Sequence, residues 1–212
     1  MAANSINENK IDGSGIDSGP LQKLVVFDRL QIGPVAVETK RIVSPYRLVF
    51  DGREEVTELV YSYEEDVFDP AEPESQNLAS MISAQAALNY GLFCKEIVFE
   101  GLFDENDRRL LKEMAENTAR EIYVKRFLMH NPFLLDEAKG IPAVKRKSYL
   151  SAKLRFPRYA SGKKRPTWKI WNTDKNRCAI LSSGGKDSLL SFGLVRELGR
   201  EVHPIYVNES GR

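Results

Sequence analysis

The sequence predicts an α/β protein, with an α+β N-terminal region of antiparallel strands followed by the start of a doubly wound parallel sheet. Two observations support this prediction. Strand-like runs with a tight-turn signal occupy residues 35–63, and an apolar run at residues 178–181 leads through paired glycines into a helix-forming segment. The chain has 212 residues, of which 42% are hydrophobic, so it can bury a core of its own.

The antiparallel strands are predicted from three apolar or alternating runs, at residues 35–37, 46–50 and 57–63. The Asp51-Gly52 pair between the last two runs is typical of a hairpin turn. An earlier run at residues 24–27 is expected to form the first strand, and order should begin near Leu21.

Helix and strand signals alternate after these strands. Residues 64–74 are acidic, include two prolines and predict a solvated loop, whereas residues 78–92 have helical composition. Residues 96–101 are expected to form a short strand. Asp104 then stands where its side chain can cap a helix N-terminus, and that helix is expected to end near Met129.

Basic residues dominate residues 145–177, which hold twelve Lys or Arg residues and one acid, Asp174. We interpret this segment as a solvated linker whose aromatic side chains pack onto the flanking domains. The alternative is that these side chains stack on the bases of a nucleic acid. The aromatic residues are Tyr149, Phe156, Tyr159, Trp168 and Trp171.

The residues that carry the chemistry lie between the apolar run and the helical segment that follows it. They are Ser183, Gly184, Gly185, Lys186, Asp187 and Ser188. Paired glycines let backbone N–H groups approach phosphate oxygens, the serines can donate hydroxyl hydrogen bonds, and the helix presents its positive N-terminus to an anion. The segment is not a Walker A loop, because Asp187 rather than Ser or Thr follows Lys186. It predicts a phosphate-binding loop of another kind.

This loop resembles the Ser-Gly-Gly-x-Asp-Ser signature of the PP-loop ATP pyrophosphatase superfamily, the adenine nucleotide alpha hydrolase-like proteins, at all five fixed positions. The resemblance implies a PP-loop sheet and ATP as the bound nucleotide. It also implies that the loop holds the β- and γ-phosphates while a substrate oxygen attacks the α-phosphate. Mg²⁺ is implied as well, because the developing phosphate charge needs a cation.

A second parallel strand is expected at residues 201–207. Ligands bind at the carboxyl ends of such strands, so Glu209 and Arg212 are candidates for substrate or metal contacts, although residues near a terminus are as readily solvated. His203 and His130 fit strand and turn positions better than a catalytic role. The sequence therefore identifies no catalytic residue.

A finer resemblance, from about residue 21 to the end, is to the UDP-N-acetylmuramoyl-L-alanyl-L-glutamate epimerase family. It rests on the N-terminal strands, on Asn-Pro-Phe-Leu-Leu at residues 131–135, on the loop, and on Asn-Glu-Ser-Gly-Arg at residues 208–212. The resemblance implies that ATP adenylates the terminal glutamate carboxylate of a UDP-linked muramoyl dipeptide in peptidoglycan precursor synthesis. The mixed anhydride would make the α-proton acidic enough for removal and return on the other face.

Two other functions stay open. A PP-loop enzyme that modifies transfer RNA would use the basic aromatic segment, but Cys94 and Cys178 lie too far apart in sequence for the paired-cysteine arrangement of sulfur transfer. An inactive truncated fragment is the second, because only one helix and one strand follow Ser188. We therefore expect a C-terminally incomplete nucleotide-binding domain, an inactive chain when alone, and a complementing C-terminal polypeptide as a partner.

The predicted organisation is a disordered leader at residues 1–20, an α+β domain at 21–144, a basic linker at 145–177, and a truncated PP-loop nucleotide-binding domain at 178–212. The 31 basic and 30 acidic residues nearly cancel, so the overall charge does not favour a nucleic acid or a membrane as partner. The first twenty residues lack the apolar segment of a secretory signal, and later apolar runs are short for a bilayer. A cytoplasmic protein is expected.

Overall fold

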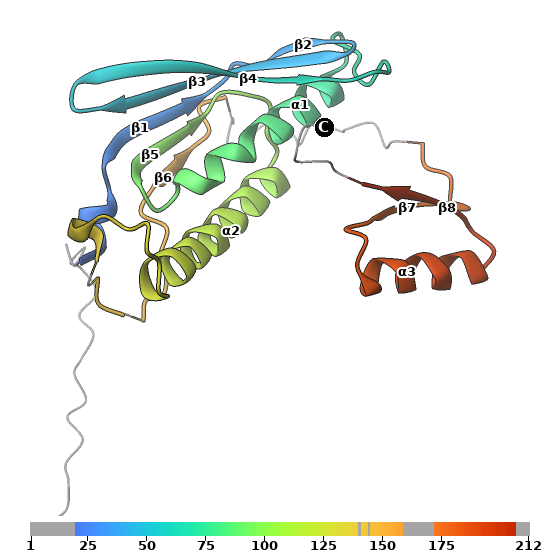
Figure 1. Ribbon diagram of the computed structural model, residues 1–212. Helices are drawn as coiled ribbons and strands as arrows, with labels where there is room; N and C mark the ends of the chain where they lie inside the picture. Colours follow the sequence, from blue (N-terminus) through green and yellow to red (C-terminus); the bar gives the residue numbers. More distant parts are fainter. Residues whose placement is uncertain (1–19, 140, 144, 159–171, 207–212) are drawn as a thin grey trace, which may run out of the picture. The chain divides into compact units, whose positions relative to one another are not determined.

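A computed structural model describes residues 20–139, 141–143, 145–158 and 172–206 (Figure 1). The chain divides into two compact units, Met1–Trp168 and Lys169–Arg212. The predicted leader at residues 1–20 lies outside the described residues, apart from its last position. In the part of the chain that the structure describes, no helix has both the length and the apolar composition needed to cross a membrane.

The first unit is built on a six-stranded mixed sheet. Five of its strands follow the order β2-β3-β1-β5-β6, and the sixth, β4, also pairs with β3. The strands are β1 (Phe27–Ile32), β2 (Ala36–Glu38), β3 (Arg41–Phe50), β4 (Arg53–Ser62), β5 (Cys94–Phe99) and β6 (Lys153–Arg155). Strand β3 pairs antiparallel with β1, β2 and β4, whereas β5 pairs parallel with β1 and β6. The prediction of an α/β protein with antiparallel N-terminal strands is confirmed.

The hairpin of β3 and β4 shows why the turn could be predicted. Asp51 and Gly52 adopt φ values of 49° and 71°, and a two-residue turn with both φ values positive matches the twist of antiparallel strands. The ladder runs from the pair Phe50 and Arg53 to the pair Arg41 and Ser62. The first strand differs from its prediction, because residues 20–24 form the 3-10 helix η1 (Pro20–Leu24) and β1 begins only at Phe27.

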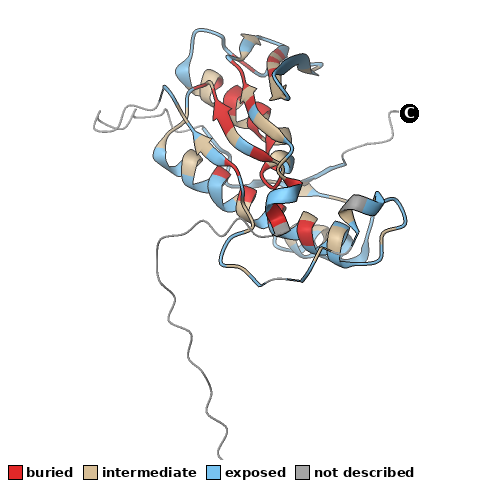
Figure 2. Ribbon diagram, turned by 90° about the vertical axis from the view of Figure 1, so that its left-hand side faces the viewer, coloured by how far each residue is buried: buried red, intermediate tan, exposed pale blue. Residues whose placement is uncertain are grey.

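Helices cover one face of this sheet, and the buried residues gather between the two layers (Figure 2). The helical elements between β4 and β6 are α1 (Pro73–Ala84), the 3-10 helix η2 (Ala86–Tyr90), α2 (Glu105–Ile122), a π-helical turn η3 (Tyr123–Leu128) and the 3-10 helix η4 (Asp136–Ala138). Leu30, Ile97 and Phe99 from the sheet meet Leu111 and Ala115 from α2 in one cluster. This packing gives the first unit a core of its own.

The predicted cap of α2 is confirmed. Asp104 accepts a hydrogen bond from the backbone N–H of Asp107 at 2.8 Å, and the Asp107 carboxylate accepts one from the backbone N–H of Asp104 at 2.8 Å. The two bonds form a capping box. The helical segment continues through η3 to Leu128, which agrees with the expected end near Met129.

Residues 145–158 are predicted to be part of a basic linker, but in the structure they pack with the first unit. Its residues Lys153–Arg155 form β6, which pairs with β5 through Ile97 and Leu154. Two backbone N–H groups just before β6, those of Ser151 and Ala152, donate to the carbonyl oxygen of Gly91 at 3.0 and 2.9 Å. Residues 145–158 therefore belong to the first unit, and the division between the units, after residue 168, falls within the segment predicted as the linker, residues 145–177.

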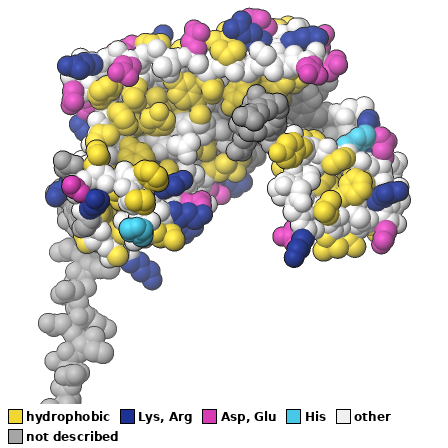
Figure 3. Space-filling model, viewed as in Figure 1, with side chains coloured by type: hydrophobic (Ala, Val, Ile, Leu, Met, Phe, Trp, Pro, Cys, Tyr) yellow, Lys and Arg dark blue, Asp and Glu magenta, His cyan; other side chains and the backbone are white. Residues whose placement is uncertain are grey.

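The second unit is a β-α-β segment. Strand β7 (Arg177–Leu181) is followed by α3 (Lys186–Glu197) and then by β8 (Glu201–Ile205), which pairs parallel with β7. The predicted strand, helix and second strand are confirmed. The apolar run at residues 178–181 suggests a strand buried in a sheet, and this expectation is wrong for the described residues. None of the residues 172–206 is buried, and Leu181 is 75% exposed. Two strands and one helix bury too little surface to enclose a side chain, and hydrophobic side chains appear on the surface of this unit (Figure 3).

Candidate phosphate-binding site

The candidate loop joins the carboxyl end of β7 to the N-terminus of α3. The backbone N–H of Ser182 donates to the carbonyl oxygen of Ile205 at 2.8 Å, which extends the parallel ladder one residue beyond β7. The chain then turns at Gly184, whose φ is +76°, and Gly185 takes the extended N-cap conformation with φ −83° and ψ 168°. The loop therefore lies where parallel sheets present ligands.

Three hydrogen-bonding contacts hold the loop together. The backbone N–H of Gly184 donates to Ser182 Oγ at 3.3 Å, and Ser182 Oγ lies 3.4 Å from Ser188 Oγ. Ser188 Oγ in turn donates to the carbonyl oxygen of Gly185 at 2.9 Å. Ser182 is a loop residue that the motif does not include, and its position directly after the strand was the signal that could have identified it.

The N-terminus of α3 is open. Gly185 at the N-cap has no side chain, and no other side chain caps the helix. Among the described residues, no group accepts a hydrogen bond from the backbone N–H of Lys186, Asp187 or Ser188. A helix begins with unpaired N–H groups that carry partial positive charge, so these three donors are available to an anion.

The charged side chains of the loop are exposed. The side chains of Lys186, Asp187 and Ser183 have no hydrogen-bond or ion-pair partner among the residues that the structure describes. A lysine at this point can neutralise a bound phosphate, whereas the carboxylate of Asp187 would repel it unless a cation lay between them.

The described residues include no cluster of three or more His, Cys, Asp or Glu side chains that could hold a metal ion. Mg²⁺ often binds through one or two carboxylates together with substrate phosphates and water, and such a site does not need a protein cluster. Asp187 is the carboxylate that the loop offers for this purpose. The residues present therefore fit a magnesium nucleotide, with the phosphates supplying most of the ligands.

The two glycines play different parts. Gly184 has a positive φ that side chains rarely adopt, and a Cβ built on it would have no atom within 4 Å. A Cβ on Gly185 would meet only Ser183 Oγ, at 3.4 Å, which is an ordinary contact. The fold thus needs glycine at residue 184 for its backbone conformation, whereas at residue 185 the absence of a side chain leaves the helix N-terminus uncovered.

The other candidates for substrate or metal contacts, Glu209 and Arg212, lie outside the described residues. His203 lies on β8, where its Nε2 is 2.8 Å from Glu201 Oε1 on the same strand. Arg177 on β7 is opposite Glu201 in the register and lies 3.4 Å from Glu201 Oε2, so His203 forms a cross-strand cluster with these two residues. This arrangement agrees with a strand role for His203.

Two aromatic residues of the predicted linker pack within the first unit. Tyr149 stacks on Tyr123 with ring centroids 5.0 Å apart, and Phe156 stacks on Phe99 at 5.0 Å. The guanidinium carbon of Arg108 lies 5.4 Å from the centre of the Phe156 ring. Tyr159, Trp168 and Trp171 lie outside the described residues. The rings of Tyr149 and Phe156 are engaged with the protein itself, which leaves less surface for nucleic acid bases.

Comparison with known proteins adds no family to this geometry: no family model matches the chain, and no curated protein matches it significantly.

Proposed function

We propose that the loop at residues 183–188 binds the β- and γ-phosphates of ATP and that the chain is part of a PP-loop enzyme that adenylates a carboxylate. The observation that carries the proposal is the open N-terminus of α3, directly after a glycine turn at the end of a parallel strand. Three features of this loop suit a polyphosphate: free backbone donors, a nearby lysine, and a backbone conformation that requires glycine. Mg²⁺ bound to the nucleotide would neutralise charge that develops on the phosphates.

The substrate we propose is the terminal L-glutamate of UDP-N-acetylmuramoyl-L-alanyl-L-glutamate. This choice rests on the order of sequence segments that resembles the epimerase family. A carboxylate oxygen would attack the α-phosphorus, pyrophosphate would leave, and the acyl adenylate would have a more acidic α-proton than the carboxylate. Return of the proton on the other face and hydrolysis would give the epimer and AMP. Transfer RNA is the less favoured substrate, because Tyr149 and Phe156 are packed in the first unit.

Nucleotide binding can be tested by titrating the full chain with magnesium ATP, pyrophosphate and AMP in a calorimeter. We expect ATP and pyrophosphate to compete and AMP to bind at least about tenfold more weakly, because AMP lacks the two phosphates that the loop holds. Gly184→Val should weaken ATP binding by a similar factor, because valine resists the positive φ of this turn. The matched control is Gly193→Ala within α3, where an added Cβ meets no atom within 4 Å. Equal affinity for AMP and ATP would contradict the proposal.

The proposed chemistry has a separate readout. In deuterated water, adenylation of the dipeptide followed by proton exchange would place deuterium on the glutamate α-carbon and release pyrophosphate. The assay should be run with the chain alone and with a complementing C-terminal polypeptide. UDP-N-acetylmuramoyl-L-alanine, which lacks the terminal glutamate, serves as the control substrate. Adenylation of transfer RNA, but not of the dipeptide, under the same conditions would favour the alternative substrate.

A further inference from the structure

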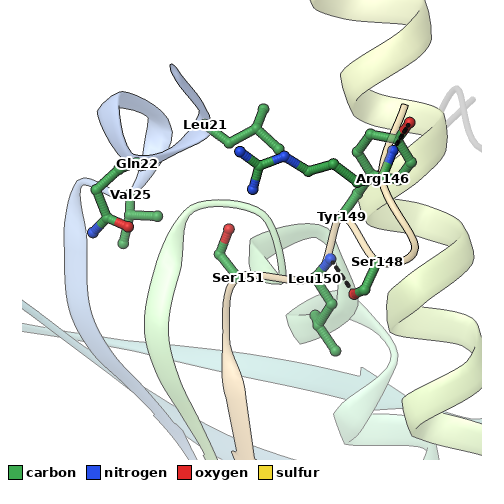
Figure 4. Close-up of a pocket in the computed structure, with 8 residues that line it drawn as sticks. All are labelled: Leu21, Gln22, Val25, Arg146, Ser148, Tyr149, Leu150 and Ser151. Atoms are coloured by element: carbon green, nitrogen blue, oxygen red, sulfur yellow. Dashed lines mark hydrogen bonds between the residues drawn. The ribbon is translucent and has the colours of Figure 1, made fainter. Parts of the chain in front are cut away.

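A cavity of about 310 Å³ lies in the first unit, away from the phosphate-binding loop in sequence. Leu21, Gln22 and Val25 form one wall, and Arg146 with residues 148–151 forms the other (Figure 4). Its volume falls at the lower end of the ~300–1,000 Å³ typical of small-molecule sites. No element of the proposed nucleotide site contributes to it.

Both walls are held in place by packing behind them. Leu21 and Leu24 of η1 are buried in a cluster with Tyr123. Tyr149 stacks on Tyr123 from the other wall, so the two sides share one aromatic support. The backbone at Ser151 is bonded to Gly91 at 3.0 Å. The cavity therefore exists before any ligand arrives, which lowers the entropy lost on binding.

Arg146 supplies the positive charge of the cavity. Its side chain is half-buried and extends into the space between the two walls, above Ser151 (Figure 4). Only its backbone N–H is engaged, with Tyr149 Oη at 3.2 Å, and among the described residues the guanidinium has neither an ion-pair nor a hydrogen-bond partner. A half-buried guanidinium whose N–H donors are unpaired is expected to bind an anion.

The other polar groups of the cavity are neutral. The side chains of Gln22 and Ser151 have no protein partner among the described residues, and no acidic residue lines the space. The nearby carboxylate of Glu116 accepts a hydrogen bond from Ser148 Oγ at 2.6 Å rather than pairing with Arg146. The cavity therefore combines one positive charge with two neutral polar side chains that have no partner among the described residues, and with the apolar side chains of Leu21 and Val25.

We propose that this cavity binds a small organic carboxylate with an aliphatic portion. A guanidinium matches the planar carboxylate through two parallel hydrogen bonds, and one positive charge balances one negative charge. A phosphate dianion would leave a charge uncompensated in a half-buried site. The amide of Gln22 and the hydroxyl of Ser151 can complete the oxyanion contacts, while Leu21 and Val25 cover the aliphatic part.

The test uses 4-methylpentanoate, 4-methylpentanamide and 3-methylbutyl phosphate as probes, titrated into the full chain and followed by backbone amide chemical shifts. The carboxylate should shift the amides of Gln22 and Ser151 and bind at least about tenfold more tightly than the neutral amide. Equal affinity for the acid and its amide would overturn the proposal, as would tighter binding of the phosphate. Shifts confined to residues outside the cavity would overturn it as well.

Three variants separate binding in the cavity from a general effect of charge. Arg146→Gln should lose the preference for the carboxylate, whereas Lys147→Gln, which removes the same charge from an exposed neighbour, should keep it. Gln22→Glu places a carboxylate within the lining at an exposed position, so it should pair with Arg146 and exclude the probe without loss of the fold. Equal losses in Arg146→Gln and Lys147→Gln, or undiminished binding in Gln22→Glu, would contradict the assignment.

Discussion

Asp104 and Asp107 close the N-terminus of α2, since each carboxylate accepts the backbone N–H of the other residue at 2.8 Å. The N-terminus of α3 has no such closure, and Gly185 stands where Asp104 stands in α2. The same chain thus contains one helix whose first N–H groups are partly satisfied internally and one whose first N–H groups have no acceptor among the described residues. The difference gives the first helix end a stabilising role and supports the binding role that we propose for the second.

Removal of the α2 cap should lower stability. Asp104→Ala leaves the backbone N–H of Asp107 without its acceptor, and we expect a loss of about 1 kcal/mol in the free energy of unfolding. The measurement is urea unfolding followed through amide signals of β1 and β5. Glu113→Ala, on an exposed position of the same helix, is the control and should change stability by less than about 0.5 kcal/mol.

Adding a cap to α3 should have opposite effects on stability and binding. Gly185 already has the extended conformation of an N-cap, so Gly185→Asp can accept hydrogen bonds from Asp187 or Ser188 and raise stability by about a few tenths of a kcal/mol. The new carboxylate would occupy donors that the nucleotide needs and repel its phosphates. We expect magnesium ATP to bind at least about tenfold more weakly, as measured by calorimetry. Unchanged affinity would mean that the helix N-terminus does not contact the phosphates.

The two cysteines should differ in reactivity. Burial raises the pKa of Cys94 to about 12, because the thiolate loses its hydration in the core, whereas Cys178 is partly accessible. Iodoacetamide at pH 8 should therefore label Cys178 well before Cys94 in the folded chain. Peptide mapping by mass spectrometry measures the two rates, and similar rates would show that the core around Cys94 opens readily.

The raised pKa of Cys94 also predicts that the free energy of unfolding depends on pH. The unfolded thiol ionises near a pKa of about 8.5, so the contribution from the neutral buried Cys94 is complete below that pH. It is lost as pH rises towards the folded pKa of about 12. Urea unfolding between pH 8 and 11 should show a decline that is smaller in Cys94→Ala at the same amide signals. An identical decline in both proteins would assign the effect to other groups.

Local signals explain which parts of the fold could be predicted. Three features depend on residues that are close in sequence. They are the Asp51-Gly52 turn, the Asp104 cap, and the loop with paired glycines that joins β7 to α3. Strand β6 has no such signal, because Leu154 is its only apolar residue and its partner Ile97 lies in a distant strand. In η1, Leu21 and Leu24 are both buried, and their three-residue spacing fits a 3-10 helix better than the strand expected there.

The two candidate sites differ in the same way, because one depends on residues close in sequence and the other does not. The loop at residues 183–188 could be found because its glycines and serines are consecutive, and its support by Ser182 was the part that the motif did not include. The cavity at Arg146 could not be found from the sequence, because η1 and the segment before β6 meet only through the fold. Spacing along the chain carries no information about such a meeting.

The packing of Phe156 provides a test of whether residues 145–158 belong to the first unit. Phe156 stacks on Phe99, meets Phe103 edge-on at 5.3 Å and receives the guanidinium of Arg108 on its ring. A solvated linker would lose almost nothing on truncation of this side chain. A half-buried ring in three such contacts should instead stabilise the unit by about 2 kcal/mol, below the ~3–5 kcal/mol of a fully buried phenylalanine.

We therefore expect Phe156→Ala to lower the urea midpoint of the β1 and β5 amide signals, with Lys147→Ala as the control from the same segment, exposed and outside the aromatic cluster. The signals of β7 and α3 should keep their midpoint in both variants, because these elements belong to the second unit, whereas Phe156 belongs to the first. A loss below about 0.5 kcal/mol in Phe156→Ala would return this segment to the role of a linker. It would also free the ring for the nucleic acid bases that the transfer RNA alternative requires.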